Sequence, residues 1–266
     1  MPTTADDILT LIDEGFVGLR ANQKARRYIG GSNVGGPSDA ALSFSLRGFP
    51  DDEPPPKLQR IFGFGHKAED LIVGDLKRSK LTVLDRDPVS GRQFAYSMHG
   101  GHIRGNIDGQ IELDDGELAL LEIKTMNASK WRAFVKHGIG KSHPQYVDQM
   151  QTYMGMAGFE KAVMLAYNKD TSEYHAEIVE FDEIAFHALI ARAERVMGGH
   201  APRVTDNPDD WRCKFCFKRG VCREGRRPDK DCATCQHSIA QDDGRWFCTH
   251  KNETAQEVCD DYRVWT

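Results

Sequence analysis

The strongest constraint on the fold is an apolar segment that ends in two opposite charges. Residues 117–124 read Glu-Leu-Ala-Leu-Leu-Glu-Ile-Lys, which suits a buried β-strand except at Glu122 and Lys124. Because successive side chains on a strand point to opposite faces, these two share one face, while Leu121 and Ile123 point away. Charges inside a sheet carry a desolvation cost unless a partner compensates. The segment therefore predicts a strand whose charged face meets a cation.

A second carboxylate lies within reach of this strand. Asp108 precedes Glu122, and the turn residues Asp-Asp-Gly at 114–116 separate the two. A hairpin at that turn could place Asp108 beside Glu122. Two carboxylates suit Mg²⁺ or Mn²⁺, which can activate water and neutralise charge on a phosphoryl group. We expect Asp108 and Glu122 to hold the metal, and Lys124, with a lowered pKa, to orient or deprotonate the water.

Hydrophobic periodicity predicts a mixed α/β chain. We expect an N-terminal helical region (1–56), a core (57–198) and a cysteine-rich tail (199–266). On the long helix, His66 and Glu69 lie close together. The expected helices cover 5–22, 40–47, 57–78, 129–135, 144–156 and 182–196. The expected strands cover 81–84, 93–97, 102–113 and 117–125, as an antiparallel meander, and then 162–167 and 174–181.

At Asp108 and Glu122-Ile123-Lys124 the sequence resembles the PD-(D/E)xK nuclease superfamily. Gly65-His66-Lys67-Ala68-Glu69 and Gln149-Met150-Gln151-Thr152-Tyr153 are similar to two further motifs of one branch. That branch includes the RecB nuclease domain, CRISPR-associated RecB-like exonucleases and phage exonucleases. The resemblance covers about residues 30 to 198, and implies a restriction-endonuclease-like core of a mixed central sheet flanked by helices.

The resemblance also implies roles for single residues. His66 and Glu69 would join Asp108, Glu122 and the backbone carbonyl of Ile123 as ligands of Mg²⁺ or Mn²⁺. Gln149 and Tyr153 would face the site from one side of a helix. Asn106, Gln110 and Gln145 are further candidates for lining a groove.

All seven cysteines lie between Cys213 and Cys259, in a segment poor in aliphatic residues that is expected to need metal to fold. Four of them follow a CxxC-x12-C-x10-C spacing that suits structural zinc, and His237 or His250 could replace one thiolate. These are Cys232, Cys235, Cys248 and Cys259.

The other three cysteines, Cys213, Cys216 and Cys222, follow CxxC-x5-C. This spacing resembles part of the iron-sulfur motif of RecB-like nucleases, but the relatives' fourth cysteine, which precedes the core, has no counterpart here. A [4Fe-4S] cluster with an unusual fourth ligand and a second zinc site using a histidine such as His200 both stay open.

The expected function is a metal-dependent deoxyribonuclease that acts on linear or single-stranded DNA ends in end processing, recombination or repair. The preference for an exonuclease comes from the resemblance, as does a recombination partner such as a single-strand annealing protein. The alternatives are a structure-specific or nicking endonuclease, or an inactive nucleic-acid-binding module.

The bulk properties agree with a folded intracellular protein. The formal net charge of -5 does not by itself indicate a nucleic-acid binder, although a metal nuclease can look acidic because its bound cations are not counted. No apolar run approaches the roughly 18 residues of a membrane helix, and the N-terminus lacks a signal-peptide pattern. We expect no membrane partner and a cytoplasmic location, in a bacterial cell or a phage-infected host.

Overall fold

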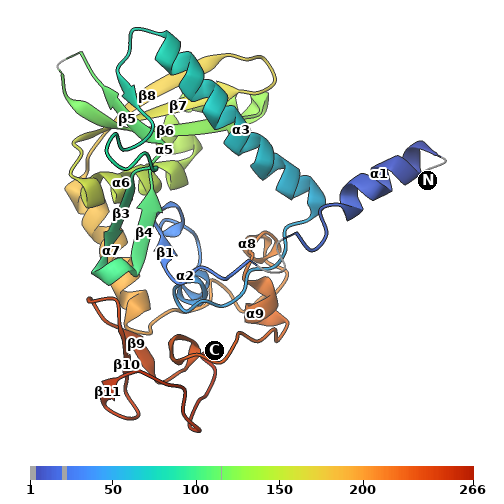
Figure 1. Ribbon diagram of the computed structural model, residues 1–266, viewed down its shortest axis with the longest axis vertical. Helices are drawn as coiled ribbons and strands as arrows, with labels where there is room; N and C mark the ends of the chain where they lie inside the picture. The colour runs from blue at the N-terminus through green and yellow to red at the C-terminus, as the bar shows by residue number, and fades with distance from the viewer. Residues whose placement is uncertain (1–3, 20–22, 115) are drawn as a thin grey trace.

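The computed structural model describes residues 4–19, 23–114 and 116–266 (Figure 1). Its centre is a five-stranded sheet of order β2-β5-β6-β7-β8, in which β6 and β7 are parallel and the other neighbours antiparallel. The predicted α/β class, a mixed central sheet flanked by helices, is confirmed. The strands are β2 (Val83–Leu84), β5 (Gly109–Glu112), β6 (Leu118–Met126), β7 (Lys161–Asn168) and β8 (Tyr174–Glu180).

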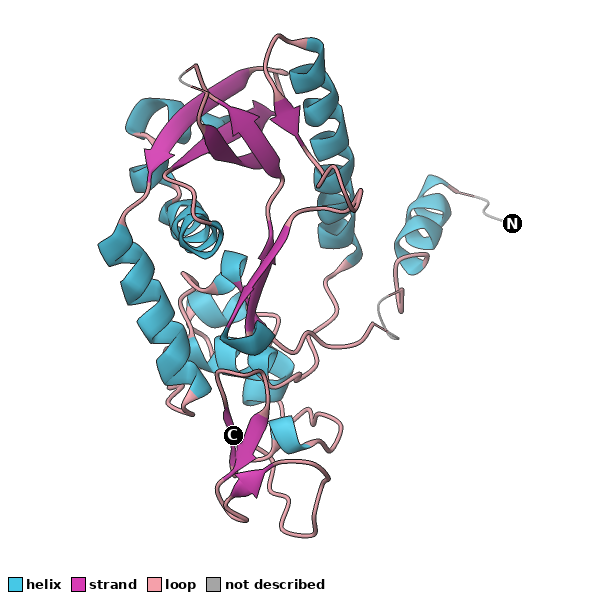
Figure 2. Cartoon of the chain, turned by 60° about the vertical axis from the view of Figure 1, so that its left-hand side comes forward, coloured by secondary structure: helices cyan, strands magenta, loops and turns pink. Residues whose placement is uncertain are grey.

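Two helices cover the faces of this sheet, α3 (Pro56–Arg78) and α6 (Pro144–Ala157). The two helices lie on opposite faces of β6. Leu121 packs in the core that includes Ile72 of α3, whereas Leu120 packs in the core that includes Met150 of α6. Figure 2 shows α3 running along the sheet. The even-numbered face of β6, which carries Glu122 and Lys124, therefore lies on the α6 side. The short helices α4 (Ala128–His137) and α5 (Ile139–Ser142) connect β6 to α6.

A second sheet lies beside the first, with the order β1-β4-β3. The prediction of one strand over 102–113 is wrong, because the chain leaves the small sheet after Asn106 and enters the large one at Gly109. Ile107 between them is fully buried in the core of the α6 face, which fixes the crossing point. The expected continuous meander is therefore divided between two sheets. The elements here are β1 (Ile29–Gly30), η1 (Gly31–Asn33), β3 (Ala95–Met98), η2 (His99–Gly101) and β4 (Ile103–Asn106).

The N-terminal helix is shorter than predicted. α1 (Ala5–Glu14) is capped by Thr4, buries none of its side chains and extends away from the body (Figure 1). It ends before Gly15, so the helix expected over 5–22 stops early, and residues 20–22 lie outside the described residues. In the next helix, α2 (Asp39–Leu46), five of the eight residues are buried.

The cysteine-rich tail follows α7 (Glu183–Met197) and packs against α2. Trp265 and Val264 contact a cluster that contains Phe44 and Phe49, so the tail shares a core with the N-terminal region. The three-part division at residues 57 and 199 stays a prediction. None of the described helices is long and apolar enough to cross a membrane. The tail elements are α8 (Trp211–Lys214), α9 (Arg219–Arg223), η3 (Cys232–Thr234), β9 (Ser238–Ala240), β10 (Trp246–Cys248) and β11 (Glu253–Thr254).

Candidate active site

Asp108 and Glu122 meet where β5 and β6 open. Gly109 pairs with Leu121, so the same register places Asp108 opposite Glu122. The Asp108 Oδ2 atom accepts a 2.7 Å hydrogen bond from the backbone N–H of Ile123. The expected neighbourhood of the two carboxylates is confirmed, although Asp115 of the expected turn lies outside the described residues. The role expected of the Ile123 carbonyl stays a prediction.

The carboxylate of Glu122 is fully buried and incompletely satisfied. Its Oε1 accepts hydrogen bonds from Lys124 Nζ and from Gln149 Nε2, the latter at 2.6 Å. Its Oε2 is buried and accepts no hydrogen bond from the described residues. A buried charged oxygen without a partner is costly. A cation beside Glu122 Oε2 would remove that cost, so the carboxylates fit the expected metal.

Burial raises the pKa of all three carboxyl groups of the site. Burial raises the pKa of Glu122 to about 7, and the charges of Asp108 and Glu69 add to this effect. Burial likewise raises the pKa of Glu69 to about 7, with Asp108 as the next contributor. The pKa of Asp108 is also raised by burial. The site thus concentrates negative charge that its own residues do not fully neutralise, as expected where a cation binds.

The expectation of a lowered pKa for Lys124 is wrong for this arrangement. Burial would lower the pKa of the ammonium, but the negative charges of Glu122 and Asp108 outweigh burial and raise it. The Nζ atom also lies 5.3 Å from the ring centroid of Tyr146, a cation–π contact that favours the charged form. Lys124 is therefore held as an ammonium group.

Helix α3 brings Glu69 and His66 towards this cluster. Glu69 is half-buried, and its pKa responds to the charges of Asp108 and Lys124. His66 lies one turn earlier, is exposed, and acts through its charge on Asp108. Asp70, also on α3, is exposed and acts on Glu69. Both residues expected from the long helix thus lie in electrostatic range of Asp108.

Helix α6 delivers Gln149 and Tyr153 to the other side of the cluster. The side chains lie one turn apart and both are buried. Burial raises the pKa of Tyr153 to about 12, with the charge of Glu122 contributing and a hydrogen bond with Ser32 opposing it. A Cβ on Gly31 or Gly105 would overlap the Tyr153 ring, so both glycines are required for its position. The pair faces the site as expected.

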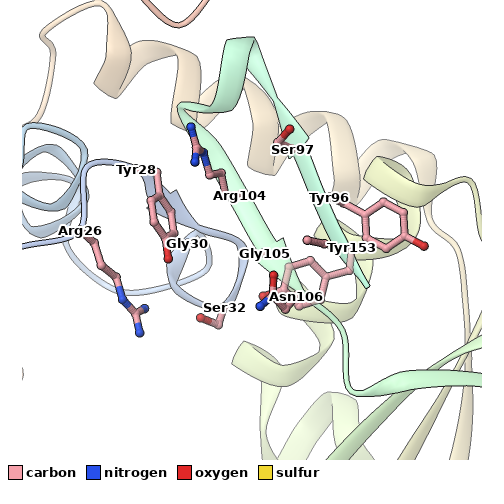
Figure 3. Close-up of a pocket in the computed structure, with 11 residues that line it drawn as sticks. Arg26, Tyr28, Gly30, Ser32, Tyr96, Ser97, Arg104, Gly105, Asn106 and Tyr153 are labelled. Carbon is pink, nitrogen blue, oxygen red and sulfur yellow. The ribbon is translucent and has the colours of Figure 1, made fainter. Parts of the chain in front are cut away.

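A pocket of about 510 Å³ is lined in part by Tyr153, whose pKa responds to the charge of Glu122 (Figure 3). Asn106 was an expected groove residue and lines the pocket; Gln110 contacts the hydroxyl of Tyr96, another lining residue. Gln145 does not line it. No local sequence pattern indicates the remaining side chains that line the pocket, because they come from separate segments. Those are Arg26, Tyr28, Ser32, Ala95, Tyr96, Ser97 and Arg104.

The four cysteines expected to bind zinc converge on one cavity of about 200 Å³. Burial raises the pKa of Cys232, and the other three cysteines of the set, Cys235, Cys248 and Cys259, contribute through their charges. The remaining three also form a group, since burial raises the pKa of Cys216, with charge contributions from Cys222 and Cys213. All seven thiols are free of disulfides.

Among the described residues, none of the three expected metal centres has its ligands arranged around a common metal position. Across residues 4–19, 23–114 and 116–266, no group of three or more His, Cys, Asp or Glu side chains is arranged so that it could hold a metal ion as it stands. At the carboxylate cluster, Lys124 occupies the hydrogen-bonding position at Glu122 Oε1. All three metal assignments therefore stay predictions.

No family model matches the chain. Over 123 residues, the chain is 27% identical to the CRISPR-associated exonuclease Cas4 of Saccharolobus solfataricus. The matched stretch covers 45% of this chain and 52% of that protein, so the chain spans about half the length of this curated relative.

Two solved structures are distantly similar. The alkaline exonuclease LHK-Exo of Laribacter hongkongensis is 18% identical with a TM-score of 0.42, and covers 70% of this chain and 91% of its own. The protein SSO0001 is 14% identical with a TM-score of 0.48, and covers 83% and 97%. At these scores the likenesses carry no conclusion about function.

Proposed function

We propose that the chain is a divalent-metal-dependent deoxyribonuclease. The observation that supports this most directly is the buried, unpartnered Oε2 of Glu122 beside Asp108, in a site whose carboxyl pKa values are raised. The partial sequence match to an exonuclease points the same way. Asp108 and Glu122 would hold Mg²⁺ or Mn²⁺, with Glu69, His66 and the Ile123 carbonyl as further ligands.

The residues around the cation would divide the work of phosphodiester hydrolysis. When bound, the cation would supply charge neutralisation at the phosphoryl oxygens and a lowered pKa for water. Lys124, held as an ammonium group, would orient water and stabilise negative charge rather than accept a proton. Gln149 would fix the rotamer of Glu122, and Tyr153 would close the wall between cluster and pocket.

The mode of action that we propose is exonucleolytic, on linear or single-stranded ends in DNA processing, recombination or repair, with a single-strand annealing protein as a candidate partner. We also propose structural zinc at the cavity lined by Cys232, Cys235, Cys248 and Cys259. A second metal or iron-sulfur centre would use the group of Cys213, Cys216 and Cys222. Absorbance near roughly 400 nm in anaerobically purified protein separates iron-sulfur from zinc.

Digestion of matched DNA substrates tests the proposed activity. We would incubate end-labelled linear DNA and covalently closed plasmid with wild type and Lys124→Ala, in Mg²⁺, Mn²⁺ or EDTA. We expect the wild-type protein to degrade the linear DNA, and not the closed plasmid, when Mg²⁺ or Mn²⁺ is present. We expect no degradation with EDTA or by Lys124→Ala. Cleavage of the closed plasmid would instead indicate an endonuclease. If neither substrate is degraded under any of these conditions, the proposal is overturned. The alternative of an inactive nucleic-acid-binding module would then be favoured.

A further inference from the structure

The pocket beside the carboxylate cluster is positively charged and partly aromatic. Arg26 and Arg104 line it, and none of its described lining residues is acidic. This charge is the reverse of that at the neighbouring carboxylates. A cationic or purely apolar ligand is therefore disfavoured, whereas an anion with a flat apolar part matches the lining.

The ring of Tyr28 supplies a flat aromatic surface in the pocket. Figure 3 shows Tyr28 and Arg26 on one side of the pocket, across from Asn106 and Tyr153. The guanidinium of Arg104 lies 5.7 Å from the ring centroid of Tyr28 and is fixed by a 2.6 Å hydrogen bond from its Nε to the carbonyl of Gly101. Arg104 thus helps to hold the Tyr28 ring in place.

Unlike Arg104, Arg26 has a guanidinium that is available to bind a ligand. It is exposed, and within the described ranges no hydrogen bond or ion pair engages its guanidinium. An arginine that lines a pocket without a carboxylate partner is available to an incoming anion, and its planar fork matches a phosphate group.

We propose that this pocket binds one unpaired nucleotide of the substrate strand, with its base against the Tyr28 ring and its phosphate at Arg26. The volume of about 510 Å³ suits one small ligand and is far too small for a duplex. Base–aromatic stacking combined with basic side chains is the usual means of holding single-stranded nucleic acid. The pocket would therefore select strands with an unpaired end.

The pocket lies close to the proposed catalytic residues. Its role in selecting the substrate therefore rests on the proposed function. Tyr153 lines the pocket, and the charge of Glu122 acts on its hydroxyl. Asn106 also lines it and precedes Asp108 by two residues. In the proposed arrangement, the strand would continue from the nucleotide at Tyr28 past Tyr153 towards the carboxylates.

The test measures binding without catalysis. The affinity of the full chain for dAMP and for deoxyribose 5-phosphate would be measured calorimetrically, without added Mg²⁺ or Mn²⁺, for wild type, Tyr28→Leu, Tyr28→Phe and Arg26→Gln. Arg203→Gln, an exposed arginine that does not line the pocket, is the matched control. Far-UV circular dichroism monitors folding of each variant.

We expect Tyr28→Leu to weaken dAMP binding by about 5- to 100-fold, as for loss of one base–aromatic stack, and Tyr28→Phe to retain it. Deoxyribose 5-phosphate should bind more weakly than dAMP and be insensitive to Tyr28→Leu. Arg26→Gln should weaken both ligands and Arg203→Gln neither. Equal dAMP affinity in wild type, Tyr28→Leu and Arg26→Gln would overturn the proposal, as would no dAMP binding by wild type. Should Tyr28→Leu fail to fold, Arg26→Gln decides alone.

The two proposals fail separately. If dAMP binding depends on Tyr28 but the protein degrades no DNA, the nucleotide-binding proposal holds and the nuclease proposal fails. Degradation of DNA with Mg²⁺, together with dAMP binding indifferent to Tyr28 and Arg26, would do the reverse.

Discussion

Gln149 donates a 2.6 Å hydrogen bond to Oε1 of Glu122, across the interface between helix α6 and strand β6. Both side chains are buried, so the bond fixes the orientation of the carboxylate in the absence of bulk water. The same oxygen accepts from Lys124, while Oε2 is left without a partner among the described residues. Gln149 and Lys124 thus both bond to Oε1, and Oε2 is the oxygen of Glu122 that remains available to the proposed cation.

Replacing Gln149 should lower nuclease activity without unfolding the protein. In Gln149→Leu, Glu122 loses a donor that fixes its rotamer, and losses of such supporting partners typically reduce metal affinity or activity by about 10- to 100-fold. Gln151→Leu is the matched control, because Gln151 lies on the same helix but bonds to Glu180 and Asp182. It should reduce stability and leave kcat/KM unchanged. Equal kcat/KM in Gln149→Leu and wild type would contradict the assigned role.

The stability of the protein without divalent cations should fall as pH rises from about 4.5 to about 7. Glu122 and Glu69 have pKa values near 7 when folded, against an ordinary value of 4.5. In this window the folded chain retains protons that the unfolded chain has released, so rising pH favours unfolding. Saturating Mg²⁺ should flatten the decline, since a bound cation favours the ionised carboxylates. Urea titrations at pH 5, 6 and 7 check both statements, and a slope unaffected by Mg²⁺ would refute the second.

Gly105→Ala should destabilise the protein by about 1–3 kcal/mol, because the new methyl group overlaps the buried Tyr153 ring. Gly74→Ala makes the same chemical change inside helix α3, where nothing lies within 4 Å, and should stabilise by about 0.5–1 kcal/mol. Thermal unfolding distinguishes the two. Removing the ring in Gly105→Ala/Tyr153→Leu should recover part of the loss, and a strictly additive double variant would count against the overlap as its cause.

Arg47 should control attachment of the cysteine-rich tail. Arg47 is 1% exposed, and its guanidinium donates to the carbonyls of Ala233, Cys235 and Ser238 at 2.9–3.0 Å. Arg47→Met leaves these acceptors without their donor, so the tail should loosen and become sensitive to protease. Arg47→Lys should rescue little, because a single ammonium cannot reproduce the planar fork. Limited proteolysis with mass spectrometry would report this; a tail as resistant as in wild type would show that other contacts suffice.

Local patterns were enough to predict the catalytic candidates. The alternation in β6 and the turn before it determine that Asp108, Glu122 and Lys124 meet, since both depend on residues close in sequence. The (i, i+4) spacing on α6 likewise determines that Gln149 and Tyr153 share a side. The cysteine spacing predicted which four thiols line one cavity.

Features that depend on distant segments escaped prediction. The break of the expected 102–113 strand follows from burial of Ile107 under α6, which no local pattern encodes. The raised pKa of Lys124 follows from two carboxylates within a buried site, an effect that outweighs the burial of the lysine itself. The pocket joins β1, β3, β4 and α6, so its tyrosines and arginines carried no shared signal in the sequence.

Binding of Mn²⁺, followed by the electron paramagnetic resonance of the free ion, tests the metal site most directly. Wild type and Asp108→Asn would be compared, with Asp114→Asn as an exposed control from the same hairpin. The wild-type protein should bind Mn²⁺ at a site that Asp108→Asn weakens by about a hundredfold or more and Asp114→Asn leaves intact. Identical Mn²⁺ binding by all three proteins would contradict a cation held by Asp108 and Glu122.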